Sequence, residues 1–185
     1  EGLQGGGIQR VPGGDVGLAV VLATIIGLIL LAWAILFITK GRFLKPYFER
    51  YTSEQAFRRV DVAGDFQLYF NPINIKFLAE GLTISNPAWA SRKNLFESKR
   101  IDTNIAAVPL IFGRRRLNWL DLVDGNLDLE WDKTGTRNTW TLGDPSKPPE
   151  PLEMPVIRRA SIVGSDLRYL APQMDFVADI KIETV

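Results

Sequence analysis

The sequence predicts a mainly β protein that carries one transmembrane α-helix near its N-terminus. Two observations predict this fold class. The stretch 16–39 is predominantly apolar and contains no charged residue, whereas from Arg58 onward apolar and polar residues alternate with a period of two. Such alternation gives each strand one apolar and one polar face, as in an antiparallel sheet that is covered on one side.

Composition excludes several classes of protein. The chain has 185 residues, with 22 Lys and Arg against 21 Asp and Glu, and this balance provides no general attraction to nucleic acid. Cysteine and histidine are both absent, so a disulfide framework, a cysteine nucleophile, the usual zinc sites, histidine-ligated haem and the commonest general base are excluded. An enzyme of this composition would have to use carboxylates, lysine or serine. We expect a protein that is not an enzyme and holds no metal or cofactor, with a bound lipid as the one open case.

The apolar stretch 16–39 is long enough to be a membrane anchor. As a helix it would extend roughly 36 Å, which exceeds a hydrocarbon core of about 30 Å. A cleaved signal peptide, the alternative, would have a shorter apolar region followed by a small-residue cleavage site. Trp33 and Phe37 lie toward the C-terminal end of the stretch, where aromatic side chains favour the membrane interface. The preceding residues 1–15 form a Gly-rich tail, and an ordered tail there would indicate contact with another chain.

Segment 40–57 follows the anchor and combines aromatic and basic residues. Leu44, Phe48 and Tyr51 recur at helical spacing, which predicts a short interfacial helix with aromatic rings in the headgroup layer and cations near lipid phosphates. A helix that packs on the following domain fits the same pattern. The candidate interface residues of this segment are Lys45, Tyr47, Phe48, Arg50 and Tyr51.

The remaining chain is predicted to form one β domain. Residues 58–142 are expected to be antiparallel strands, 143–156 a Pro-rich connector, and 157–185 further strands of the same domain. Periodicity alone does not distinguish a β-sandwich from a sheet with an open groove. The expected turns are Gly64-Asp65, Asn71-Pro72, Glu80-Gly81, Asn86-Pro87, Gly113, Asp124-Gly125 and Thr134-Gly135.

Several short motifs follow one another in a particular order. After the single span come 82–89 (LTISNPAW), then Pro109-Leu110 with Gly113, then two strands expected to pair, 117–122 and 127–131, and finally Gly135 with Asn138 and Trp140. Over roughly 16–185 this order resembles the N-terminal region of the AsmA family of bacterial envelope proteins. The resemblance implies an inner-membrane anchor, a periplasmic β domain, a part in envelope lipid homeostasis and no catalytic residues.

Long members of that family are similar to bridge-like lipid transporters, in which stacked β repeats form an apolar groove. This chain offers little more than one such repeat, and a strand of five or six residues spans only about 17–20 Å. If 185 residues were close to the whole protein, bridging two membranes would be excluded. The basic residues that follow the span also favour a cytoplasmic C-terminal side by the positive-inside rule, whereas the resemblance favours the periplasm, which we adopt.

Three groups of residues are candidate sites. Arg114, Arg115 and Arg116 are expected to form a solvated turn rather than a site for lipid phosphates or an acidic partner. The carboxylates of the acidic run are expected to line a solvated strand face rather than a hydrolase site, and their spacing does not match a calcium loop. Four tryptophans could dock a partner or the headgroup layer, but they are expected to pack in the core, with Trp89 the most exposed. The acidic run is Asp121, Asp124, Asp128, Glu130 and Asp132, and the tryptophans are Trp89, Trp119, Trp131 and Trp140.

Three functions follow as hypotheses, in decreasing order of preference. The first is an accessory subunit that caps a larger inner-membrane complex, respiratory or photosynthetic, with membrane lipids and other integral subunits as partners. The second is lipid handling, which requires an apolar groove left open by strands. The third is a hydrolase that uses the acidic run. The groove would be formed by the strands that bear Ile101, Ile105, Leu127, Leu129 and Ile180.

Overall fold

The structure is a computed structural model that describes residues 13–147 and 155–184. The chain divides into two compact units, 1–38 and 39–185. The contact predicted for the Gly-rich tail falls largely on residues 1–12, outside the described ones.

The first unit contains helix α1, Gly13–Ile38. Its 23 residues Val16–Ile38 are long and apolar enough to cross a membrane, and their side chains are mostly exposed rather than packed within the unit. The predicted helix over 16–39 is therefore present.

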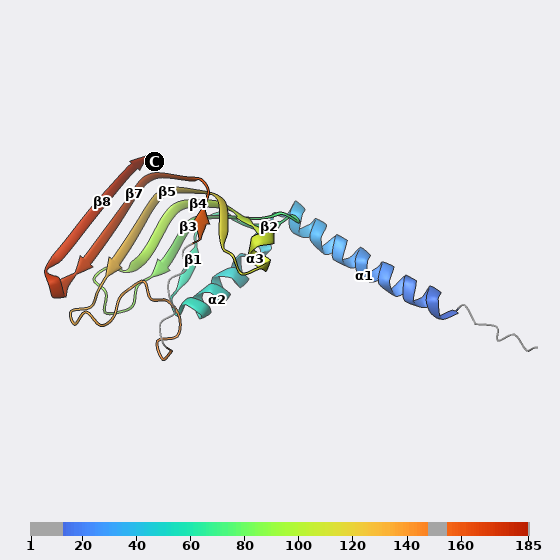
Figure 1. Cartoon of the computed structure of the whole chain (residues 1–185), viewed down its shortest axis with the longest axis horizontal. Helices are drawn as coiled ribbons and strands as arrows, with labels where there is room; N and C mark the ends of the chain where they lie inside the picture. The colour runs from blue at the N-terminus through green and yellow to red at the C-terminus, as the bar shows by residue number, and fades with distance from the viewer. Residues whose placement is uncertain (1–12, 148–154, 185) are drawn as a thin grey trace, which may run out of the picture. The chain divides into compact units, whose positions relative to one another are not determined.

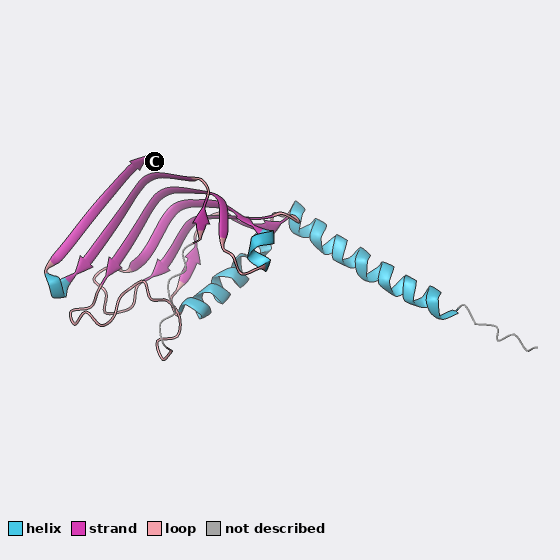
Figure 2. Cartoon of the chain, in the orientation of Figure 1, coloured by secondary structure: helices cyan, strands magenta, loops and turns pink. Residues whose placement is uncertain are grey.

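The second unit is built around one mixed sheet, in which the described residues form eight strands (Figures 1 and 2). The main order is β1-β3-β4-β5-β7-β8, with β2 paired to β3 and β6 paired to β5. The elements are η1 Arg42–Leu44, α2 Lys45–Ala56, β1 Val60–Val62, β2 Phe66–Phe70, β3 Asn74–Ser85, β4 Asn94–Ala106, α3 Ala107–Ile111, β5 Arg116–Glu130, β6 Val156–Ile157, β7 Ala160–Ala171, η2 Pro172–Met174 and β8 Phe176–Thr184.

The strands of the sheet run between two opposite ends. We call one the tip end, formed by the β2–β3 turn, α3 with the following residues 112–115, and β6. The opposite loop end is formed by residues 86–93, residues 131–142 and η2. Figure 1 shows α3 and η2 at these opposite ends of the sheet.

The expectation of a purely antiparallel sheet is wrong at β5, which has two parallel neighbours. β5 and β7 run parallel, in register from Leu120 opposite Ala160 to Glu130 opposite Leu170, and β6 also pairs with β5 in parallel. β5 ends at the loop end, and the segment that contains the Pro-rich connector returns the chain to the tip end before β7 begins. Parallel neighbours require such a long return connection, whereas a hairpin would have made the pair antiparallel.

Helix α2 covers the N-terminal part of the sheet and completes its core. The buried core consists of Val60, Val62, Phe66, Ala79 and Leu82. Phe48 of α2 packs against this core, with its ring centre 5.1 Å from that of Phe66 and 5.3 Å from that of Phe77. Of the two interpretations left open for this segment, packing on the following domain holds for Phe48, because the apolar stripe of α2 is used for packing on the sheet and not in the headgroup layer.

Two expected turns are instead interruptions within continuous strands. β3 runs through Gly81, and β5 runs through Asp124, so the expected strands 117–122 and 127–131 are one strand apart from Trp131, which follows its end. Gly81, Asp124 and Gly164 all have left-handed backbone conformations, with φ of 64°, 48° and 60°. The pairing registers on either side place these three residues in one row across the sheet. We call this row the crease.

The crease keeps the apolar side chains on one face. Ala79 and Leu82 lie three positions apart, so strict alternation would place them on opposite faces. Both nevertheless belong to the same buried core. The left-handed Gly81 thus resets the alternation within β3, and β5 and β7 each carry a left-handed residue at the same level of the sheet.

Candidate functional site

One face of the sheet carries a continuous apolar row that crosses six strands. Val60 pairs with Ile84, Ile84 with Phe96, Phe96 with Leu127, Leu127 with Leu167, and Leu167 with Ile180. Directly paired residues in neighbouring strands point to the same face. The row therefore joins the core under α2 to the edge strand β8, and we call this side of the sheet the apolar face.

The apolar face is closed at one side and open at the other. Val60 is buried at the α2 side, Leu127 and Leu167 are half-buried, and Ile180 on β8 is 50% exposed. Of the strands expected to form a groove, the one bearing Ile101 packs against the core under α2. Leu129 is half-buried on β5, beside Tyr169, in the more open part of the face.

Aromatic rings border the open part at the loop end. Trp131 and Trp140 meet edge to face with ring centres 5.1 Å apart, and Trp140 lies 6.2 Å from Tyr169. The indole Nε1 of Trp131 donates a hydrogen bond of 2.9 Å to the hydroxyl of Tyr169. Tyr169 in turn contacts Phe176 at the start of β8, with ring centres 6.1 Å apart. These contacts fix the aromatic border in place.

The opposite face holds three carboxylates of the acidic run, and the expectation that they line a solvated strand face is wrong. Asp128, Glu130 and Asp132 are only 3–7% exposed. Loops at the loop end cover them and donate hydrogen bonds to them, because a buried carboxylate needs such partners. Alternation correctly placed the three on one face, but it carried no information about the loops above that face.

Two of these carboxylates hold the loop of residues 86–93. Asp128 accepts hydrogen bonds from Asn86 Nδ2 at 3.2 Å and from Arg168 Nη1 at 2.9 Å. Glu130 accepts from the backbone N–H of Ser91 at 2.9 Å and from its hydroxyl at 2.7 Å. The Asn-Pro-Ala-Trp segment is thereby tied to β5.

Asp132 holds the second loop, which contains Gly135 and Arg137. It accepts hydrogen bonds from Thr134 Oγ1 at 2.9 Å, Arg137 Nε at 2.9 Å and the backbone N–H of Thr136 at 3.0 Å. Burial by itself disfavours the charged form of Asp132, but hydrogen bonds from Arg137, Thr134 and the loop backbone outweigh it and hold the pKa of Asp132 well below its usual range. The Arg137 guanidinium also lies 5.4 Å from the ring centre of Trp89.

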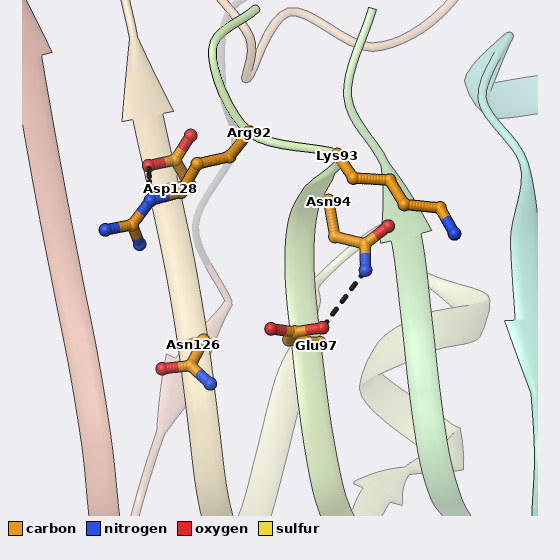
Figure 3. A pocket seen from close by; sticks show the side chains of 6 residues that line it. All are labelled: Arg92, Lys93, Asn94, Glu97, Asn126 and Asp128. Atoms are coloured by element: carbon orange, nitrogen blue, oxygen red, sulfur yellow. Dashed lines mark hydrogen bonds and ion pairs between the residues drawn. The ribbon is translucent and has the colours of Figure 1, made fainter.

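A hollow of about 290 Å³ lies beside these carboxylates on the same polar face (Figure 3). Arg92 Nε is 3.6 Å from Asp128 Oδ1, and Asn94 Nδ2 donates to Glu97 Oε2 at 3.0 Å. The charged groups thus largely satisfy one another. Among the described residues, no group of three or more carboxylates is arranged to hold a metal ion. The lining residues are Arg92, Lys93, Asn94, Glu97, Asn126 and Asp128.

The structure distributes the predicted interface residues over separate regions. Trp33 and Phe37 pair on α1, with ring centres 5.7 Å apart. On α2, Tyr47 and Tyr51 are exposed, Arg50 lies 5.7 Å from the ring centre of Tyr47, and Lys45 Nζ donates to the carbonyl of Gly64. The basic group lies at the tip end, where Arg114 and Arg115 are exposed and Arg116 is half-buried.

The four tryptophans of the β domain are all half-buried, Trp89 included. Trp119 lies on the polar face, where Lys76 Nζ is 3.9 Å from its ring centre. Lys76 also forms an ion pair with the buried Asp102. Each tryptophan is therefore held by a defined neighbour.

Comparison with known proteins identifies the family. The model of the AsmA family matches residues 16–174, which is most of the chain. The chain belongs to the AsmA family. No curated protein and no solved structure matches it. With α1, this membership indicates a membrane-associated protein of the envelope and lipid-related class.

In this AsmA-family protein, motifs that are distant in sequence meet at the loop end. The segment 82–89 reaches residues 135–140 through Trp89 and Arg137, and both loops are anchored on β5. Sequence reasoning missed the crease and the parallel pair. Isolated glycines within strand patterns, Gly81 and Gly164, were the available signal for the crease.

Proposed function

We propose that this AsmA-family protein is a non-catalytic, membrane-anchored lipid-handling protein whose apolar face binds acyl chains. The observation that carries this proposal is the row from Val60 to Ile180, which is sealed by α2 at one side and is half-buried to exposed from β5 to β8. An apolar surface of this kind in water favours an apolar ligand, because covering it removes apolar area from solvent.

The open part of the apolar face has a rigid border, which suits a binding surface. The aromatic border at Trp131, Trp140 and Tyr169 is fixed by ring contacts and one hydrogen bond, so binding there would order few additional side chains. The polar loops lie on the opposite face and are satisfied by buried carboxylates. Chemistry at those carboxylates is not needed for this function.

A photoactivatable phospholipid tests the proposal. The full chain is reconstituted with this lipid, irradiated, digested and mapped by mass spectrometry, so that adducts on the sheet are separated from adducts on α1. We expect adducts on β5, β7 and β8. Labelling confined to α1 would contradict the proposal.

Two neighbouring positions on β8 provide a matched pair of variants. Ile180→Asp places a charge on the apolar face and should reduce labelling of the sheet several-fold. Lys181→Asp changes the charge at the next residue, which points to the opposite face, and should leave labelling unchanged. Equal effects of the two substitutions would argue against binding on the apolar face.

An accessory role in a larger membrane complex is a second candidate. The apolar side chains of α1 are exposed along its length, and the space around Gly17 and Gly27 is open, which allows another helix to approach closely. Isolation from native membranes tests this role: co-purification of a stoichiometric integral partner would support it, and a lone monomer would contradict it. An inner-membrane anchor with a periplasmic β domain is proposed from family membership, and protease accessibility in spheroplasts tests it.

A further inference from the structure

The tip end carries four strongly exposed apolar side chains. They are between 66% and 79% exposed, although they belong to a folded domain. Hydrogen bonds join the segments that bear them: the backbone N–H of Ala107 donates to the carbonyl of Ile73 at 2.8 Å, and that of Val156 donates to the carbonyl of Arg115 at 3.0 Å. We call these four residues the apolar tips: Ile73, Ile111, Phe112 and Val156.

Backbone N–H groups around the apolar tips form hydrogen bonds within the domain. Asn71 Oδ1 accepts hydrogen bonds from the backbone N–H groups of Ile73 and Asn74 at 2.9 and 2.8 Å. The N–H of Phe112 donates to the carbonyl of Pro109 at 3.1 Å, and the N–H of Gly113 donates to that of Leu110 at 3.0 Å. These segments can therefore enter an apolar layer without exposing these donors to it, which would otherwise cost free energy.

Basic residues flank the apolar tips. Arg114 follows Phe112 closely and is exposed, and Arg158 and Arg159 follow β6 and are also exposed. Apolar side chains that project beside arginines are typical of surfaces that enter the headgroup layer of a membrane containing anionic lipid. The alternative of a merely solvated turn explains the arginines but not the exposed Ile111 and Phe112.

The short link between α1 and the β domain indicates that a membrane is what contacts the tip end. α1 ends at Ile38, and the carbonyl of Lys40 already accepts a hydrogen bond of 3.0 Å from the backbone N–H of Leu68 in β2. Arg42 Nε forms an ion pair of 2.8 Å with Asp65 just before β2. Two residues span at most about 7 Å, so β2 must lie close to the surface of any membrane that α1 crosses. β2 leads within a few residues to Ile73.

We propose that the tip end docks on the leaflet of anionic phospholipid from which α1 emerges. The apolar tips enter the headgroup layer, and Arg114, Arg158 and Arg159 meet lipid phosphates. This docking is independent of acyl-chain binding on the apolar face, because the residues involved are different.

Single cysteines test the proposal, since the chain has none of its own. The full chain carrying Ile111→Cys or Ile73→Cys is labelled with the fluorophore NBD and reconstituted into vesicles that contain phosphatidylglycerol. We expect aqueous dithionite to reduce both labels several-fold more slowly than a label at Met174→Cys. Met174 is comparably exposed but lies in η2 at the loop end, so it serves as the control position. The measurement counts only those protein molecules whose β domain faces the outside of the vesicle.

Two controls test the role of the arginines and the alternative of a protein partner. Arg114→Gln with Arg158→Gln should accelerate reduction at position 111 in phosphatidylglycerol vesicles and have a smaller effect in phosphatidylcholine vesicles. Equal reduction rates at positions 73, 111 and 174 would overturn the proposal. Protection seen in native membranes but absent from pure lipid vesicles would indicate a protein partner and would also overturn it.

Discussion

The guanidinium of Arg137 lies 5.4 Å from the ring centre of Trp89, although the two residues belong to different loops. Arg137 is oriented by Asp132, whose Oδ2 accepts its Nε–H at 2.9 Å. The loop of residues 86–93 and the loop of residues 133–139 are thus joined above β5. The contact brings the segments 82–89 and 135–140, which are far apart in the chain, together at the loop end.

The first prediction concerns this contact. Arg137→Ala and Trp89→Leu should each lower the free energy of unfolding, and their coupling in a double-mutant cycle should be about 0.5–1 kcal/mol, as for an exposed cation–π pair. Urea unfolding of the full chain in detergent micelles, followed by tryptophan fluorescence and circular dichroism, measures it. Additive effects of the two substitutions would show that the contact contributes nothing.

The second prediction concerns acid stability. The pKa of Asp132 is held below its usual range in the folded state, whereas in the unfolded chain it returns to about 3.9. The unfolded state therefore binds more protons below that pH, so the stabilisation is complete above about pH 4 and is lost as pH falls toward the lower folded pKa. Asp132→Asn should flatten the decline of stability between about pH 4 and 2.

A second carboxylate provides an independent check of this pH dependence. A hydrogen bond from Arg42, aided by one from Gln67, lowers the pKa of Asp65 at the start of β2. Asp65→Asn should flatten the same region of the pH profile, and the double variant should flatten it further. An unchanged slope in the double variant would contradict both assignments.

The third prediction tests the crease. A Cβ atom at Gly81 would lie 2.9 Å from Cβ of Ala63, and the backbone there is left-handed. Gly81→Ala should therefore destabilise the domain by about 3 kcal/mol, through backbone strain and a clash. Gly113→Ala is the matched control, because Gly113 is also left-handed but has no atom within 4 Å of such a Cβ. It should cost only about 1–2 kcal/mol.

The fourth prediction separates packing from interfacial roles on α2. Phe48→Ala should lower the free energy of unfolding by about 3 kcal/mol, because its ring packs on Phe66 and Phe77. Tyr51→Ala, at an exposed position of the same helix, should change it by less than about 0.5 kcal/mol. Similar small effects would mean that α2 is not part of the core.

Local patterns predicted much of the fold. The charge-free stretch predicted α1, period-two alternation predicted the strands and their two faces, and the motif order predicted the family. The same patterns misjudged Asp128 and left two interpretations open for Phe48. A helical stripe of aromatic residues suits either a membrane interface or a domain core, and only the presence of the sheet beneath α2 decides between them.

The sequence by itself determined which residues share a face, because helix and strand periods are properties of the local backbone. Only the tertiary structure decided what covers each face: α2 seals one half of the apolar side, and two loops bury Asp128, Glu130 and Asp132 on the other. It also decided the parallel pairing of β5 with β7. These outcomes depend on contacts between residues far apart in the chain, for which no local pattern exists.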